Sequence, residues 1–258
     1  MISVTRIWTI AMNTVREAIR NKLLYTLLFF AVLLICAGVL LSTLSYVESE
    51  RILQDVGLAA IRLFGVAIAI FVGVGLIYKE VERRTVYTIL SKPLSRAEFL
   101  LGKYVGLVVT IWLQMGIMVA AFALVSILTG APLAVGHAAA FALTAVELAL
   151  MVAIATFFSA FTTPMLASFF STGIWVVGNL TRDLRDIGAR SDLESVRSAT
   201  VWLHRLLPDL ESFNLTIEAV HGLPITASDV WLPLCYGAGY AGIVLVCAVG
   251  IFERRDFR

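Results

Sequence analysis

The sequence predicts an all-α integral membrane protein with six transmembrane helices. Of its 258 residues, 60% are hydrophobic and 15% are charged, a balance that soluble domains do not have. Several apolar runs approach the length that crosses a bilayer. We therefore expect one transmembrane domain over 1–258, with spans at about 23–46, 57–78, 104–129, 137–161, 165–180 and 230–252.

The segment 3–22, before the first span, has the pattern of an amphipathic interfacial helix. Apolar side chains such as Ile7 and Ala11 follow helical spacing, while Arg16 and Arg20 fall on the other face. Basic residues together with Trp8 suit a helix that lies among lipid headgroups. A helix packed on the cytosolic side of the protein is the alternative.

Three polar side chains stand out within the spans. Arg62 follows a polar loop at 47–56 and lies near the outer end of span two, where its side chain could reach water. Gln114 is in span three. Glu147 is in the middle of span four, where an ionisable group is costly and tends to face the interior of a bundle. These three residues form a candidate intramembrane polar site. Glu147 has two possible roles: it could line a conduit or take part in proton movement, or it could be a helix-packing residue near Arg62 or Gln114.

Span five, at 165–180, is short. It follows the turn Thr162-Thr163-Pro164, so we expect spans four and five to be antiparallel neighbours, with span five either complete or partly re-entrant. The polar segment 181–229 comes next. Ser191 and Glu194 form a predicted capping box, and an apolar helical stripe ends at Pro208.

The segment 79–103 is charged between two apolar runs. Its residues include six cations and three anions: Lys79, Arg83, Arg84, Lys92, Arg96, Lys103, Glu80, Glu82 and Glu98. The stretch 80–90 can extend span two as a helix, and Pro93 favours a turn. Ser95 and Glu98 then predict a capping box that begins a short helix before span three. An ordinary solvated loop fits these residues equally well.

The distribution of charge predicts which side the loops occupy. The N-terminal segment, 79–103 and the C-terminal tail together hold thirteen of the twenty Lys and Arg residues and six of the eighteen acids, a net of +7. The rest of the chain carries a net of −5. Cytoplasmic loops are enriched in Lys and Arg. We therefore expect both termini and 79–103 in the cytoplasm, and 181–229 outside it.

The sequence contains no recognisable catalytic or metal-binding motif. It has no Gly-rich phosphate loop, and its three histidines lack metal-ligand spacing. We expect no metal site, no catalytic residue, no nucleic-acid partner and no enzymatic activity in this chain. A six-span protein without its own energy source is a channel, a scaffold or the membrane part of a machine that another subunit powers.

The stretch from 80 to 106 resembles the signature of ABC type-2 transporter permeases. The residues that carry the resemblance are Glu80, Glu82, Arg83, Arg84, Thr85, Leu90, Ser91, Pro93, Ser95, Arg96, Gly102 and Lys103. Many members have Gly where Arg84 stands, and this difference resembles the branch of nitrous-oxide-reductase maturation permeases. The likeness extends over nearly the whole chain.

The resemblance implies an export permease that works with two cytosolic ABC ATPase subunits. ATP and Mg would bind those subunits and not this chain. The coupling helix would be 91–98, which includes Lys92 and Leu94, with a gate helix at 80–90 above it. A helical cap at 192–210 would lie near the exit, and spans two and five would line the conduit.

The resemblance also implies a second permease copy, identical or related, in a bacterial cytoplasmic (inner) membrane. Membrane lipids would surround the assembly, and an extracytoplasmic accessory protein could join it. Another function stays open: the same ATPase-driven motion could act on such a partner through 181–229 without moving a solute.

Overall fold

The computed structural model describes residues 4–43, 48–82, 95–189 and 194–254, and within these ranges every regular element is helical. The elements in chain order are α1 (Val4–Ile19), α2 (Lys22–Ser42), α3 (Ser49–Glu82), α5 (Arg96–Leu128), α6 (Val135–Ser159), α7 (Pro164–Asn179), α8 (Thr181–Ala189), α9 (Glu194–Leu206), η1 (Glu211–Phe213), α10 (Thr216–His221) and α11 (Ala227–Arg254).

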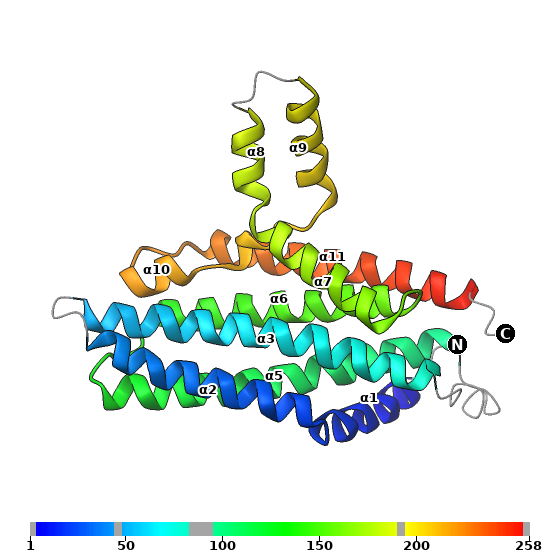
Figure 1. Ribbon diagram of the computed structural model, residues 1–258, viewed down its shortest axis with the longest axis horizontal. Helices are drawn as coiled ribbons and strands as arrows, with labels where there is room; N and C mark the ends of the chain where they lie inside the picture. Colours follow the sequence, from blue (N-terminus) through cyan, green and yellow to red (C-terminus); the bar gives the residue numbers. More distant parts are fainter. Residues whose placement is uncertain (1–3, 44–47, 83–94, 190–193, 255–258) are drawn as a thin grey trace.

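Five of the described helices, α2, α3, α5, α6 and α11, are long and apolar enough to cross a membrane. They run along the long axis of the molecule (Figure 1). The predicted span five forms α7, which has 16 residues. At 1.5 Å per residue that is about 24 Å, less than the roughly 30 Å of a hydrocarbon core. The predicted topology of six full spans is therefore not confirmed.

Helix α3 begins earlier than the sequence suggested. The predicted polar loop at 47–56 is wrong from Ser49 onward, because α3 is one helix of 34 residues. Leu53 and Gln54 in these first turns are buried, although charged residues stand on both sides of them in the sequence. The side chain of buried Gln54 donates a hydrogen bond to the Pro132 carbonyl at 3.4 Å, which anchors these first turns.

Helix α5 corrects a second prediction. Its capping box at Ser95 and Glu98 is present, but the short helix expected there does not end before span three. It continues without a break to Leu128. Gly102 and Gly106 lie within this unbroken helix. The backbone at both glycines is in close contact with α1.

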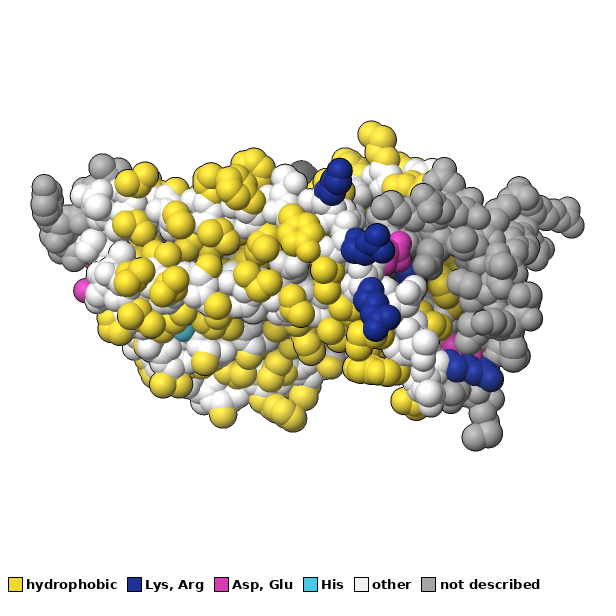
Figure 2. Space-filling view, turned by 90° about the horizontal axis from the view of Figure 1, so that it is seen from below, with side chains coloured by type: hydrophobic (Ala, Val, Ile, Leu, Met, Phe, Trp, Pro, Cys, Tyr) yellow, Lys and Arg dark blue, Asp and Glu magenta, His cyan; other side chains and the backbone are white. Residues whose placement is uncertain are grey.

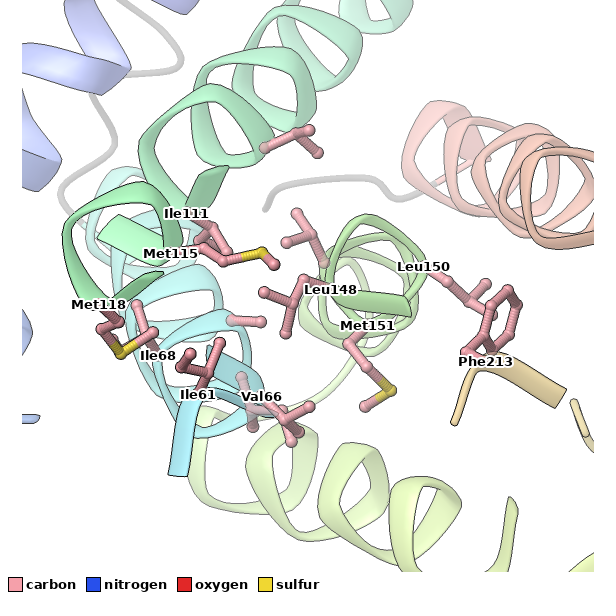
Figure 3. Close-up of a cluster of buried hydrophobic side chains, with 14 of the residues drawn as sticks. Ile61, Val66, Ile68, Ile111, Met115, Met118, Leu148, Leu150, Met151 and Phe213 are labelled. Atoms are coloured by element: carbon pink, nitrogen blue, oxygen red, sulfur yellow. The ribbon is translucent and has the colours of Figure 1, made fainter. Parts of the chain in front are cut away.

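The hydrophobic core lies between α3, α5 and α6 (Figure 3). Ile68 of α3, Ile111 of α5 and Leu148 of α6 are almost fully buried and face one another in this region. A side chain at Gly65 would place its Cβ 2.9 Å from Leu148, so the glycine permits α3 and α6 to approach closely. On the other side of α6, Leu150 packs toward Phe213 of η1.

Helices α8 and α9 lie side by side and leave the flank of the bundle, starting where α7 ends (Figure 1). They do not cover the end of the bundle, as a helical cap would. Helix α9 ends at Leu206, two residues before Pro208, as the sequence predicted. The predicted cap residue Ser191 lies outside the described residues. We call α8 and α9 together the hairpin.

Helix α1, the C-terminal end of α3 and the C-terminal end of α11 lie at the same end of the bundle (Figure 1). Helix α5 begins at this end and packs closely on α1. The charged segment 79–103 therefore joins α3 and α5 at the end of the molecule where α1 and the C-terminal end of α11 also lie.

Candidate functional site

Two opposite charges meet inside the bundle, one on α3 and one on α6. Glu147 is fully buried, and the Arg62 side chain is 15% exposed. Arg62 Nε donates to Glu147 Oε2 at 2.7 Å, and Nη2 donates to Oε1 at 3.1 Å. Burying an ion is costly unless an opposite charge and further hydrogen bonds replace its hydration. The two-point contact supplies that opposite charge.

Further hydrogen bonds surround this ion pair. Trp175 Nε1 donates to Glu147 Oε1 at 3.2 Å. Arg62 Nη2 also donates to Asn179 Oδ1 at 2.7 Å and to the Leu210 carbonyl at 3.1 Å. Asn179 Nδ2 donates to the Trp175 carbonyl at 2.8 Å. We call these five residues the Arg62 network; it joins α3, α6, α7 and the segment after α9.

The Arg62 network holds the root of the hairpin. Asn179 is the last residue of α7 and comes just before the hairpin in the chain. Leu210 comes just after the hairpin. The two chain segments are also joined directly, because Leu210 N donates to the Gly178 carbonyl at 3.1 Å. Both ends of the hairpin are thus bound to one guanidinium on α3.

The sequence anticipated the ion pair but not its surroundings. Of the two partners considered for Glu147, Arg62 is the correct one. Gln114 is buried on α5, and its Oε1 has no hydrogen-bond partner among the described residues. Arg62 is 15% exposed, and its guanidinium is held between buried Glu147 and the partly exposed Glu211, whose Oε2 lies 3.9 Å from Nη1. This geometry favours the packing interpretation of Glu147 over a proton-linked one.

The second candidate site is the beginning of α5. Ser95 Oγ accepts a hydrogen bond from Glu98 N at 3.2 Å, and Ser95 N donates to Glu98 Oε2 at 3.1 Å. Arg6 of α1 lies 3.8 Å from the same carboxylate. The cap therefore fixes the first turn of α5 and also attracts α1.

Arg96 connects α5 to the end of α11. Its Nη1 donates to the carbonyls of Phe252 and Glu253 at 3.3 and 3.0 Å. These carbonyls lie in the last turn of α11, where cations interact favourably with the helix dipole. The rings of Phe99 and Phe252 stack with centroids 6.2 Å apart.

Gly102 and Lys103 connect α5 to α1. A Cβ at Gly102 would lie 2.7 Å from the Ile10 Cβ, so only glycine allows this separation. Lys103 is 1% exposed, and its Nζ lies 3.1 Å from Glu17 Oε2. We call Ser95, Arg96, Glu98, Phe99, Gly102 and Lys103 the α5 junction.

The remaining predicted coupling residues are outside these contacts. Arg83, Arg84, Thr85, Ser91, Lys92, Pro93 and Leu94 lie outside the described residues. Glu80 and Glu82 are in the last turn of α3.

From Arg62 to that turn, α3 is unbroken over about 30 Å, at 1.5 Å per residue. One helix therefore links the Arg62 network to the predicted coupling segment.

Several contributors were missed by sequence reasoning. Trp175 and Asn179 looked like ordinary residues of a span, and nothing local marks them as partners of Glu147. Glu17 and Gly106 carried a weak signal: Glu17 is an acid on an otherwise basic face, and Gly106 follows Gly102 at the spacing of close helix contacts.

A cavity of about 680 Å³ opens beside the hairpin root. Its lining comes from α8, η1, α10, α11 and the segments between them, and includes Arg182, Asp209, Glu211, Asn214, Glu218, Asp229 and Tyr236. Arg182 Nε lies 3.0 Å from Asp209 Oδ2 across its edge. The described residues contain no group of His, Cys, Asp and Glu side chains arranged to hold a metal ion.

Comparison with known proteins identifies a family for this chain. The model of a family described as ABC-2 family transporter protein matches residues 8–257, nearly the whole chain. A search of curated proteins found no matching relative.

Proposed function

Because the chain belongs to the ABC-2 family of transporter proteins and is thus the membrane component of an ABC transporter, we propose that it passes force from a cytosolic ATPase to a transmembrane export path. Proteins of this family work with ABC ATPase subunits. In our proposal two such subunits bind ATP and Mg, and their closure moves the segment 79–103. The chain itself binds no nucleotide.

The observation that carries this proposal is the continuity of α3. A single helix extends from the Arg62 network to Glu82, next to the predicted docking segment. Helical hydrogen bonds make such a rod stiff, so displacement of one end reaches the other. Closure of the ATPase subunits would then shift an equilibrium between two arrangements of the bundle.

The α5 junction gives this segment a firm base. We assign ATPase docking to 91–98 and to the charged end of α3. Gly102 and Lys103, which the family resemblance places in the same motif, act in this proposal by holding α1 against α5. A push on the segment would then move α1, α5 and α11 together.

A second permease copy would complete the conduit. The exposed face of α7 is strongly apolar, with Met165 85% exposed and Phe169 70% exposed. The charged hairpin leaves the bundle on the same side as α7 (Figure 1), and lipid chains are a poor environment for charge. We propose that a second copy covers this side, in an inner membrane with both termini in the cytoplasm. Arg84 is our reason for proposing the branch of nitrous-oxide-reductase maturation permeases.

Charge reversal in the docking segment tests the proposal. The double substitution Arg83→Glu/Arg84→Glu should abolish stimulation of the partner ATPase by the permease, while the permease still inserts and folds. The matched control is Arg182→Glu/Arg185→Glu, which reverses two charges on the hairpin and should leave the stimulation unchanged. An ATPase rate that depends on neither pair would refute docking through this segment.

The hairpin root favours a second function, transmission of force without transport. The Arg62 network binds both ends of the hairpin, so motion of α3 would be delivered to a partner outside the bundle. Because Gly178 and Leu210 are hydrogen-bonded, a short flexible linker can replace 181–207 without stretching the root. If that variant still supports transport in vesicles but no longer binds an extracytoplasmic protein, the hairpin serves the partner. Loss of transport favours the export path.

A further inference from the structure

Three cations cluster where α1 turns into α2, and we call Arg16, Arg20 and Lys22 the α1–α2 joint. All three side chains are at least partly exposed, and the structure gives none of them a partner among the residues it describes. Backbone bonds fix the turn, since Asn21 N donates to the Ala18 carbonyl at 2.9 Å and the Asn21 side chain accepts from Leu23 N at 3.0 Å. The cations are thus held on a rigid support.

The acids that could neutralise these cations are engaged elsewhere. Glu17 lies in the same stretch, but its carboxylate is bound by buried Lys103 at 3.1 Å. Glu98 is held by the cap at Ser95 and by Arg6 at 3.8 Å. The nearby Glu17 carboxylate is thus already shared with Lys103, and three cations against this one paired acid leave the outward face of the joint with a net positive charge.

The joint lies at the edge of an apolar surface. Beyond Lys22, α2 exposes Leu23 (56%), Tyr25 (52%) and Phe29 (61%), and α1 exposes Trp8 (57%). Figure 2 shows hydrophobic side chains over much of this face and Lys and Arg side chains gathered where the apolar surface ends. Trp and Tyr prefer this depth, at the level of lipid headgroups.

We propose that the α1–α2 joint is a binding surface for anionic phospholipid headgroups. An acyl chain would lie along the exposed face of α2 while the phosphate and its extra negative charge meet the three cations. A zwitterionic headgroup offers the same phosphate but carries a compensating ammonium group, so it binds more weakly. The surface therefore selects lipids by their charge. Its cation Arg16 is on α1, the helix that Lys103 and Gly102 hold against α5.

The test uses the full chain in nanodiscs of equal parts phosphatidylglycerol and phosphatidylcholine. Spin-labelled versions of the two lipids report by electron paramagnetic resonance how much of each is immobilised at the protein. We expect phosphatidylglycerol to be preferred about fivefold or more at low salt. The preference should shrink at about 1 M salt, where screening extends over only about 3 Å.

The substitution Arg16→Gln/Arg20→Gln/Lys22→Gln should abolish the preference. The matched control, Arg182→Gln/Arg185→Gln/Arg197→Gln, removes three charges from the hairpin and should keep it. The proposal is overturned if the wild-type chain shows no preference, if the joint variant keeps it, if the control loses it equally, or if high salt leaves it unchanged. The salt series needs only the wild-type chain, so it tests the proposal even if the joint variant folds poorly.

Discussion

Glu147 and Arg62 show why a charge can be kept inside a membrane protein. Glu147 has no contact with solvent, and both of its oxygens accept hydrogen bonds. With the pair intact, the cost of burying each ion is offset by the other. With one partner removed, a buried charge stays uncompensated, which is worse than an apolar pair of the same shape.

Removing one member of this pair should therefore cost more than replacing both. We predict that Glu147→Leu alone lowers the free energy of unfolding by about 3 kcal/mol, because it leaves Arg62 buried without its partner. Arg62→Met/Glu147→Leu should lose clearly less than the sum of the two single substitutions. Reversible unfolding in mixed micelles measures all of these values in one double-mutant cycle.

The surface pair Arg51–Glu48 is the matched control for that cycle. Its atoms are 2.8 Å apart, but the two side chains are 47% and 54% exposed. Exposed pairs contribute little, so Glu48→Ala should cost less than about 0.5 kcal/mol. Equal losses from the buried and the exposed pair would contradict our account of the Arg62 network.

At the scale of elements, α1 is attached to α5 through glycine. A Cβ at Gly106 would lie 2.5 Å from the Ala11 carbonyl and 2.6 Å from the Thr14 Cβ, so a side chain there must push α1 away. Gly116 is on the same helix, and no atom of the described residues lies within 4 Å of its Cβ position. The two glycines differ in packing and not in local backbone.

We predict that Gly106→Val loosens α1 while Gly116→Val does not. Hydrogen exchange of the α1 amides should speed up by about tenfold or more in the first variant, because α1 loses its packed surface and short isolated helices are marginal. The second variant should exchange like the wild-type chain. The attachment would be disproved by unchanged exchange in Gly106→Val.

The elements also show how far the sequence could lead. Five of the expected spans have matching long apolar helices, because length and hydropathy are local properties. The start of α3 at Ser49 was missed since Glu50, Arg51 and Asp55 looked like a loop, although a helix end near water accepts them. The sideways course of the hairpin depends on one turn at Leu180 and on the Arg62 network, and neither has a local signature.

For the candidate site, the sequence showed which residues could matter but predicted few of the contacts between them. The capping box at Ser95 and Glu98 is local and was predicted correctly. The partners of Lys103 and Arg96 come from helices far along the chain, and only tertiary packing brings Glu17 and the end of α11 to them. The docking role of 91–98 stays a prediction.

At the scale of the whole molecule, helix α3 and the segment that follows it connect the Arg62 network to the α5 junction. The α5 junction ties α1, α5 and α11 together at one end of the bundle, and the Arg62 network ties α3, α6, α7 and the hairpin root deeper inside it. The segment 79–103 joins α3 to α5. A force applied there can therefore act on both sets of contacts.

The central claim, common to both proposed functions, is that ATP binding by the partner is passed along α3 to the Arg62 network, which holds the root of the hairpin. The most direct test is the distance between spin labels at Ile187 of α8 and Leu113 of α5, which are 65% and 47% exposed. The labels are placed in a chain without its three native cysteines, Cys36, Cys235 and Cys247. We predict that trapping ATP on the partner shifts this distance in the wild-type complex and not in Arg62→Met/Glu147→Leu. An unchanged distance in the wild-type complex, or the same shift in the variant, would contradict the claim.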